Sequence, residues 1–499
     1  MQKRLKATVA CLTAKIPTQL KRAICARTHA PTPQPAAAES VESAAKQDSA
    51  ALEGEFWSAS EPERRRRGEL TVPAQAHARL ETTGSLVDMR AFSMTILENG
   101  LVEWTQSEDP ADVVADFSPI TIHGVLDTGR EITLVDAMGT AGPDSQSFRV
   151  RYVLDGAHVD GHEERFSAVR FQLDDPWWWA HLKDGMSAQA GAVGSLSISR
   201  DGQSVWFVFE SAEPMTLREC DSLVISPVLT LTRLAFDVDL GIGPTQLRVD
   251  PATSPWISVL TKRRGSEPVR RTKLPTDLLL PKSVLGIDNF ATWIALSVDL
   301  DGLAAVVAHP PRGVAIQAEA LTMAAVTEGL HRRLFSGTKR FQSLGPAQRR
   351  KVRNDAIDAG TKAFENAGYP NLVEARDALT EALGHLSDVS YLSRLRELEK
   401  DATEVVPQVT AGFPNDSWGP LVVKTRNLLA HQLSNDKRVM LEKIDAMTLV
   451  TWSLPWVLRI VLLRQARVEP KIIRECFAEF SAFQYYQANV AAVQADSQR

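Results

Sequence analysis

The chain has 499 residues, too many for one compact hydrophobic core, so two or three domains are expected. Its residues are 44% hydrophobic and 23% charged, and its net charge of −5 lacks the overall basic excess of a typical duplex DNA binder. Its four cysteines (Cys11, Cys25, Cys220 and Cys476) form no CxxC pair or Cys/His cluster. These features argue against a structural zinc site and favour a reducing, cytoplasmic compartment.

The N-terminal segment differs in composition from the rest of the chain. Residues 1–38 contain seven Lys and Arg residues and no acidic residue, and residues 30–50 are rich in Pro, Ala, Ser and Gln. The basic stretch resembles a transit peptide or a weak signal sequence, but lysines break its short apolar run. We expect residues 1–50 to be a disordered basic leader or an over-extended start.

Residues 51–255 are expected to form a β-rich domain, either a sandwich or a barrel. Short alternating runs separated by turn residues predict strands at 120–126, 131–135, 148–153, 165–173, 204–209 and 245–249, the first two joined as a hairpin. Three consecutive tryptophans stand at 177–179. Neighbouring side chains on a strand point to opposite faces, so at least one should be exposed, and core or interface packing is favoured over a base-stacking platform.

The second half of the chain predicts an α-helical bundle. Residues 256–300 hold a Lys-, Arg- and Pro-rich connector and the entry to the bundle, with helical character expected beyond residue 285. The bundle itself spans 301–490. Helices are predicted at 317–335, 343–368, 371–384, 390–401, from 415 or 416 onward, 441–464 and 469–490. Pro455 and Arg459 interrupt the longest apolar run, which is too short to span a bilayer and predicts a buried core helix.

The helix that begins near residue 415 carries the most informative motif, Arg426-Asn427-x3-His431. At about 100° per residue, one face of this helix is apolar. That face consists of Trp418, Leu421, Val422, Thr425, Leu428, Leu429 and Leu433. Asn427 and His431 share the opposite face, whereas Arg426 diverges from His431 by about 140°. Two copies of this helix across a two-fold axis would gather the arginines and histidines around one phosphate.

These residue types suit RNA cleavage by internal transesterification. Histidine can move the proton between the ribose 2′-OH and the leaving 5′-oxygen, because its ordinary pKa lies near neutrality. Arginine binds phosphate as a charged, planar fork and stabilises the developing charge. The alternative is that Arg426 and His431 are simply solvated, since the same spacing occurs by chance in many helices.

The motif in its context resembles the HEPN superfamily, whose signature is Arg, four to six residues and then His, commonly with a polar residue after the Arg. The long helix with Thr327-Glu328 and His331-Arg332 resembles the first helix of the ApeA-like branch of that superfamily. The β-rich region, which opens with Gly54-Glu-Phe-Trp57 and Gly68-Glu-Leu70, resembles the N-terminal domain found with that branch. The resemblance covers about residues 50–490.

This resemblance implies a metal-independent endoribonuclease without cofactors, used in bacterial anti-phage defence by abortive infection and active as a HEPN homodimer. Arg426 and His431 would be catalytic and Asn427 an accessory. Glu328 could orient Arg426 or be an ordinary surface charge, and His331 beside two arginines is expected to be solvated. Basic residues near the bundle could bind RNA or merely solubilise a helix. The candidates are Arg349, Arg350, Lys351 and Arg353.

Two other functions remain open from the sequence. The chain could be a non-catalytic HEPN dimer that binds RNA or a partner protein, or a membrane-associated or exported protein if the leader is a targeting segment. In the nuclease interpretation, the β-rich domain would sense a phage or cellular trigger or restrain the enzyme.

Overall fold

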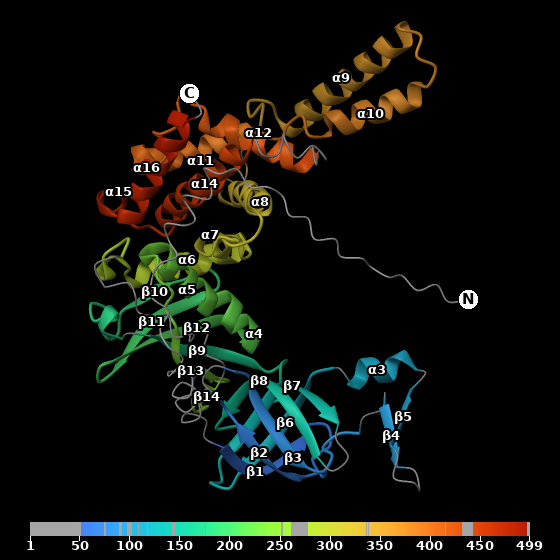
Figure 1. Ribbon diagram of the computed structural model, residues 1–499, viewed down its shortest axis with the longest axis vertical. Coiled ribbons are helices and arrows are strands. Elements are labelled where there is room, and N and C mark those ends of the chain that lie inside the picture. The colour runs from blue at the N-terminus through green and yellow to red at the C-terminus, as the bar shows by residue number, and fades with distance from the viewer. Residues whose placement is uncertain are drawn as a thin grey trace, which may run out of the picture. The chain divides into compact units, whose positions relative to one another are not determined.

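A computed structural model of the protein describes residues 51–496 except 74–75, 89–91, 97–101, 108, 117, 142–144, 175, 251–252, 261–277, 336, 338, 415 and 432–442 (Figure 1). The predicted basic leader and the cationic part of the connector lie outside the described residues. The predicted fold class is confirmed, because a β-rich region is followed by a helical region.

Most strands of the β-rich region belong to one twelve-stranded sheet, and β4–β5 form a separate hairpin. The strands are β1 (Ala51–Ser58), β2 (Arg66–Thr71), β3 (Ala78–Thr83), β4 (Phe92–Ile96), β5 (Val102–Gln106), β6 (Ile120–Leu126), β7 (Glu131–Ala141), β8 (Ser145–Asp155), β9 (Arg165–Leu173), β10 (Ser187–Gln189), β11 (Gly194–Asp201), β12 (Ser204–Thr216), β13 (Ile242–Arg248) and β14 (Ile257–Leu260). The six strands predicted from alternation are all present.

Part of the sheet closes on itself as a barrel. Its order is β8-β3-β2-β1-β6-β7, and β7 pairs back with β8, so these six antiparallel strands form a ring. Alternate residues point inward and fill it with a core of its own, which includes Phe56, Leu80 and Phe148. Gly124 lies against Phe56, and an added Cβ would come within 2.5 Å of that ring. Of the two predicted alternatives, a sandwich or a barrel, this part of the β-rich region is a barrel.

The other half of the sheet is open and is covered by helices. Its order is β10-β11-β12-β9-β13-β14, and β14 joins it to the last residues of β8. One continuous hydrophobic core runs from this open sheet into the helices, from Val135 to Val490. Trp179, Phe207 and Phe290 meet at its centre, with ring centroids 5.3–5.7 Å apart. The helices therefore bury the apolar face that the open sheet would otherwise expose to water.

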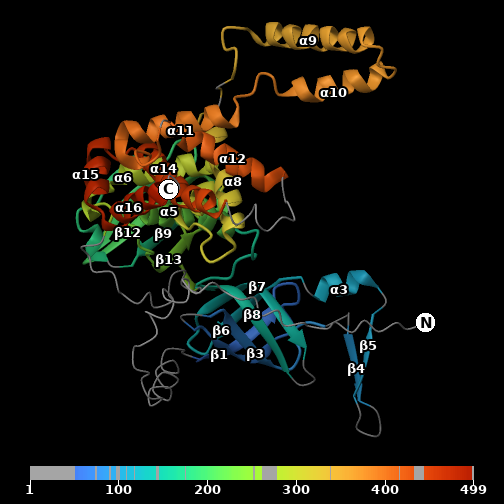
Figure 2. The ribbon, with the colours of Figure 1, turned by 45° about the horizontal axis from the view of Figure 1, so that its top comes forward.

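The helices occur on both sides of the connector. They are α3 (Pro110–Asp116), α4 (Leu217–Glu219), the π-helical η2 (Cys220–Ile225), α5 (Ser226–Phe236), α6 (Ile287–Leu300), α7 (Leu303–Ala308), α8 (Ile316–Leu334), α9 (Pro346–Asn366), α10 (Leu372–Gly384), α11 (Tyr391–Val405), α12 (Trp418–His431), α14 (Ile444–Gln465), α15 (Pro470–Glu479) and α16 (Ser481–Asp496), with 3₁₀ turns η1 (Pro176–Trp179), η4 (Lys282–Val284) and η5 (Pro407–Val409). Asn371 and Ser390 accept hydrogen bonds as the N-caps of α10 and α11. Figures 1 and 2 show α9 and α10 side by side as a hairpin.

Two helical features differ from the sequence prediction. The segment Ser226–Phe236, within the predicted β-rich domain, is the helix α5 and is mostly buried. The predicted helix 469–490 is two helices, because Phe480 adopts an extended conformation between α15 and α16. Tertiary packing sets both, and no glycine or proline marks the break at Phe480. Residues 287–300, in the predicted entry to the bundle, form α6.

The longest apolar run lies in the core, as predicted. It forms α14, the one helix in the described part of the chain that is long and apolar enough to cross a membrane, and 72% of its most apolar window is buried within the protein. The guanidinium of Arg459 is buried on this helix and donates to the Asp237 carboxylate over 2.9 Å. The cation that interrupts the apolar run is therefore paired with the residue that ends α5.

The three tryptophans illustrate how the core is built. They lie on the turn η1 rather than on a strand, with Trp177 56% exposed and Trp178 and Trp179 buried. The prediction that at least one would be exposed and that the others would pack is confirmed.

We expect Trp179→Ala to lower the free energy of unfolding by about 3–5 kcal/mol, because it leaves a cavity among Phe207, Phe236 and Phe290. The matched variant Trp177→Ala should cost less than about 1 kcal/mol, since it removes mainly a cation–π contact. Urea unfolding followed by far-UV circular dichroism measures both. Equal losses for the two variants would contradict the packing described here.

Candidate active site

Helix α12 is held in the bundle by its apolar face. It packs against α8, α11 and α14. Trp418, Val422, Thr425, Leu428 and Leu429 on this face are buried, and the Trp418 indole N–H donates to the Ser453 hydroxyl on α14 over 2.9 Å. The predicted apolar face is thus confirmed for these residues, whereas Leu433 lies outside the described residues. The opposite face carries Lys424 and Asn427, which are exposed.

Arg426 lies at the junction of three helices. Its Nη2 is 3.8 Å from Oε2 of Glu328 on α8, and its Nη1 donates to the side-chain oxygen of Asn427 over 3.2 Å. Its guanidinium carbon is 5.7 Å from the centroid of the Tyr391 ring on α11. These contacts orient the guanidinium from the side of the bundle. The side chain is 35% exposed, so part of the guanidinium stays open to solvent. A phosphate could pair with that open edge.

Glu328 is shared between two guanidiniums. Its Oε1 accepts from Arg332 on the same helix over 2.7 Å, and its Oε2 faces Arg426. The Tyr391 ring lies against Arg426 on the side of the bundle. Its hydroxyl donates to the Ala324 carbonyl over 3.0 Å, which fixes the ring on α8. Burial raises the pKa of the Tyr391 phenol, and the negative charge of Glu328 adds to that rise. The phenol therefore stays neutral beside the arginine.

The structure places the other motif residues on the same helix. Asn427 is exposed and contacts Arg426, and His431 is the last residue of α12. The His431 side chain lies outside the described part of the structure. The helix puts Arg426 and His431 about 1.4 turns apart, as the spacing predicts.

His331 is not solvated, so the expectation from its two arginine neighbours is wrong. Its ring is 1% exposed, stacks on Phe335 with centroids 4.9 Å apart and places Nε2 2.7 Å from Oε2 of Glu397 on α11. Burial lowers the pKa of the imidazole despite the opposing effect of the Glu397 carboxylate. The buried stripe of α8 is Ala320, Met323, Ala324, Val326, Thr327, Leu330 and His331.

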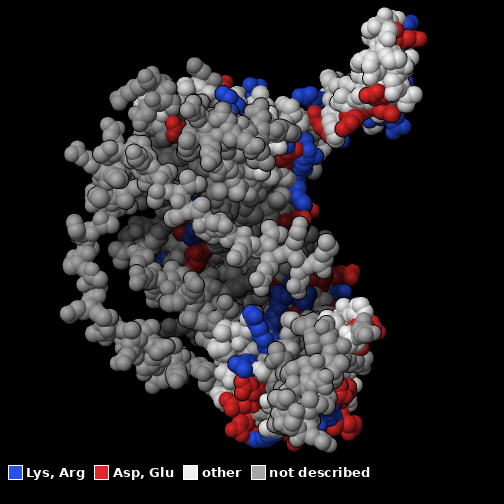
Figure 3. Space-filling view, turned by 45° about the vertical axis from the view of Figure 1, so that its right-hand side comes forward, with Lys and Arg blue, Asp and Glu red and all other residues white. Residues whose placement is uncertain are grey.

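The four cationic RNA-binding candidates lie on the first half of α9. Arg350 and Lys351 are exposed, and Arg349 and Arg353 are half-buried. Figure 3 shows basic and acidic side chains interspersed on the α9–α10 hairpin, and Asp358 of α9 pairs with Arg376 of α10 over 2.7 Å. Helix α9 packs against α10, whereas α12 packs against α8, α11 and α14. The four cations and the α12 motif therefore belong to different groups of packed helices.

Sequence reasoning missed Tyr391 as a neighbour of Arg426, Glu397 as the partner of His331 and Arg332 as the partner of Glu328. Tyr391 and Glu397 come from α11, which carries no motif of its own, and their position depends on how α11 packs against α8. The i,i+4 spacing of Glu328 and Arg332 was a usable signal for their ion pair. In the described segments, no group of three or more His, Cys, Asp or Glu side chains is placed to hold a metal ion.

Comparison with known proteins bears on the β-rich region. Residues 52–202 match the family model described as ApeA N-terminal domain 1. The match supports an ApeA-like protein. It covers the barrel and continues through β9, β10 and β11 of the open sheet, whereas the helices from α6 onward lie outside it. No curated protein and no solved structure matches the chain.

The buried His331 predicts a pH dependence of stability. Its folded-state pKa is lowered below the ordinary value near 6.5, so the unfolded state binds more protons and stability falls as pH drops below that value. We expect the thermal midpoint of the wild type to decrease as the pH is lowered from 7.5 to 5. His331→Gln should weaken that pH dependence. His385→Gln is the control, since that imidazole is exposed. Parallel curves for His331→Gln and the wild type would contradict this assignment.

Proposed function

We propose that the protein is a metal-independent endoribonuclease of the HEPN class that acts in bacterial anti-phage defence by abortive infection. The observation that carries this proposal is the half-exposed guanidinium of Arg426, which Glu328 and Asn427 orient on the helix that ends at His431. The match to ApeA N-terminal domain 1 supports the ApeA-like character of the N-terminal region and, with it, the defence role in this proposal.

In the proposed reaction, His431 accepts the proton of a ribose 2′-OH, and the resulting oxygen attacks the adjacent phosphorus. The bond from phosphorus to the 5′-oxygen breaks, and a protonated imidazole returns a proton to that oxygen. The products are a 2′,3′-cyclic phosphate and a 5′-hydroxyl. Arg426 binds the phosphate oxygens and stabilises the charge that grows on them. No step requires a metal or a cofactor.

The proposed assembly is a homodimer in the cytoplasm with RNA as substrate. Arg426 and His431 diverge by about 140° on one helix, so a second copy of α12 would supply the complementary groups at each phosphate. Arg349, Arg350, Lys351 and Arg353 remain candidates for the approach of RNA to the site. In this proposal the β-rich region senses a phage or cellular trigger.

The proposal predicts that the full-length protein cleaves total cellular RNA in EDTA and leaves 2′,3′-cyclic phosphate ends. His431→Ala and Arg426→Lys should each lower the cleavage rate by about a hundredfold or more, because one removes the proton carrier and the other the planar fork. Lys471→Ala on the exposed surface of α15 is the matched control and should cleave like the wild type. On overexpression, the wild type and the control variant should be toxic, whereas His431→Ala and Arg426→Lys should not.

Intact RNA with retained binding in EDTA, together with equal toxicity of the wild type and His431→Ala, would contradict the nuclease. That outcome would support a non-catalytic dimer that binds RNA or a partner protein. The assay uses the full chain, because a bundle cut off near residue 285 would lose the open sheet that completes its core.

A second prediction concerns Glu328 as a positioning residue. Glu328→Gln should lower cleavage by about tenfold, because a neutral amide holds the Arg426 fork less firmly. Arg332→Gln removes the other ion-pair partner of Glu328 without touching Arg426, so its cleavage rate should stay near that of the wild type. Both variants should unfold within about 1 kcal/mol of the wild type, since half-exposed ion pairs contribute little to stability. Equal cleavage by Glu328→Gln and the wild type would overturn the positioning role.

A further inference from the structure

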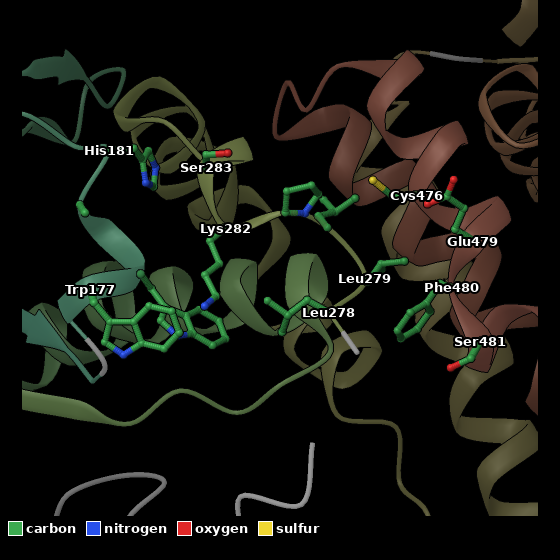
Figure 4. A pocket seen from close by; sticks show the side chains of 14 residues that line it. Trp177, His181, Leu278, Leu279, Lys282, Ser283, Cys476, Glu479, Phe480 and Ser481 are labelled. Carbon is green, nitrogen blue, oxygen red and sulfur yellow. The ribbon is translucent and has the colours of Figure 1, made fainter. Parts of the chain in front are cut away.

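A cavity of about 660 Å³ lies away from the α12 motif. Its walls come from three parts of the chain: the turn η1 after β9, the segment 278–283 before α6, and the junction of α15 and α16. In Figure 4, Trp177 and Lys282 lie on one side of it, and Glu479 and Phe480 lie across from them. The volume falls within the range of about 300–1,000 Å³ that small-molecule sites occupy.

One wall combines an aromatic surface with a cation. The Lys282 ammonium is 3.2 Å from the centroid of the Trp177 ring and 4.5 Å from that of Trp178. Trp177 is the most exposed of the three consecutive tryptophans, although its neighbours pack in the core. The Nε1–H of Trp178 is a buried donor with no acceptor among the described residues. Buried donors are normally hydrogen-bonded, and a ligand oxygen is one source of the missing acceptor.

The opposite wall is mixed in character. The Phe480 ring is buried and contributes apolar surface, whereas Glu479 and Ser481 are exposed and supply a carboxylate and a hydroxyl. A fitting ligand therefore carries a flat aromatic group, an anionic group for Lys282 and hydrogen-bond donors for Glu479. Indole faces stack on bases of any sequence, and lysine binds phosphate as a point charge.

We propose that this cavity is an effector site for a nucleoside monophosphate. The base stacks on the face of the exposed Trp177 indole that the Lys282 ammonium does not cover, the phosphate pairs with Lys282, and an amino or ribose hydroxyl group donates to Glu479. Because the walls come from both the β-rich region and the last helices, an occupied cavity stabilises their packing by mass action. The proposal does not depend on the nuclease assignment, since its test measures binding alone.

The test is isothermal titration calorimetry of the full-length protein with AMP, GMP, CMP and UMP. We expect at least one of them to bind, and the corresponding nucleoside to bind at least about tenfold more weakly because it lacks the phosphate. Trp177→Ala and Lys282→Gln should each weaken binding at least about tenfold. Trp452→Ala and Lys471→Gln are the matched controls on exposed positions of α14 and α15 and should bind like the wild type.

Arg426→Ala separates this cavity from the proposed nuclease site, because a nucleotide held at α12 would lose affinity in that variant. Retained binding by Arg426→Ala, with loss in Trp177→Ala and Lys282→Gln, supports the cavity. The proposal is overturned if none of the four nucleotides binds, or if Trp177→Ala and Lys282→Gln bind as tightly as the wild type. Far-UV circular dichroism establishes that the variants fold; Trp177 is exposed, so its replacement should preserve the structure.

Discussion

The contact between the open sheet and the helices is the constraint on which the rest of the structure depends. Trp179, Phe207 and Phe290 come from a turn, a strand and a helix, and their rings meet with no solvent exposure. The barrel has its own core, but the open sheet and the bundle share one. Each of the latter two would expose a large apolar face without the other, and such a face is costly in water. The helix that carries the candidate motif is therefore positioned by a core that begins in the β-rich region.

On helix α12, the residues that stabilise the fold differ from those that position the Arg426 guanidinium. The buried face of α12 anchors it through Trp418 and its apolar neighbours, whereas Arg426 on its flank is held by ion-pair and amide contacts. Half-exposed ion pairs add little to folding. Glu328 is thus placed where it affects the direction of a guanidinium more than the stability of the bundle. His331, three residues farther along α8, has the opposite character, because it is buried and paired with Glu397.

Local patterns predicted the elements, and tertiary contacts determined the remainder. Alternation marked β6, β9 and β12, and the helices predicted from residues 371 and 390 are α10 and α11, with Asn371 and Ser390 as their N-caps. Helix α5 escaped prediction because its run of Val, Leu and Thr also suits a strand, and only burial against α6 and α7 makes it helical. The i,i+4 spacing from Thr327 places His331 on the buried stripe of α8, which was a readable signal. The approach of Glu328 to Arg426 joins two helices far apart in sequence, so no local pattern could supply its distance.

Helix α14 connects the proposed cavity with the candidate site. It contacts α15 and α16, which form one wall of the cavity, and it also contacts α8 and α12, which carry Glu328 and Arg426. The buried pair of Arg459 and Asp237 ties it to α5, and the Trp418 indole ties it to α12. A ligand in the cavity can alter the Arg426 site only if it favours one of two arrangements of these contacts. Because protein interiors are close-packed, those arrangements would have to differ in the packing of α14, the helix that contacts both sites.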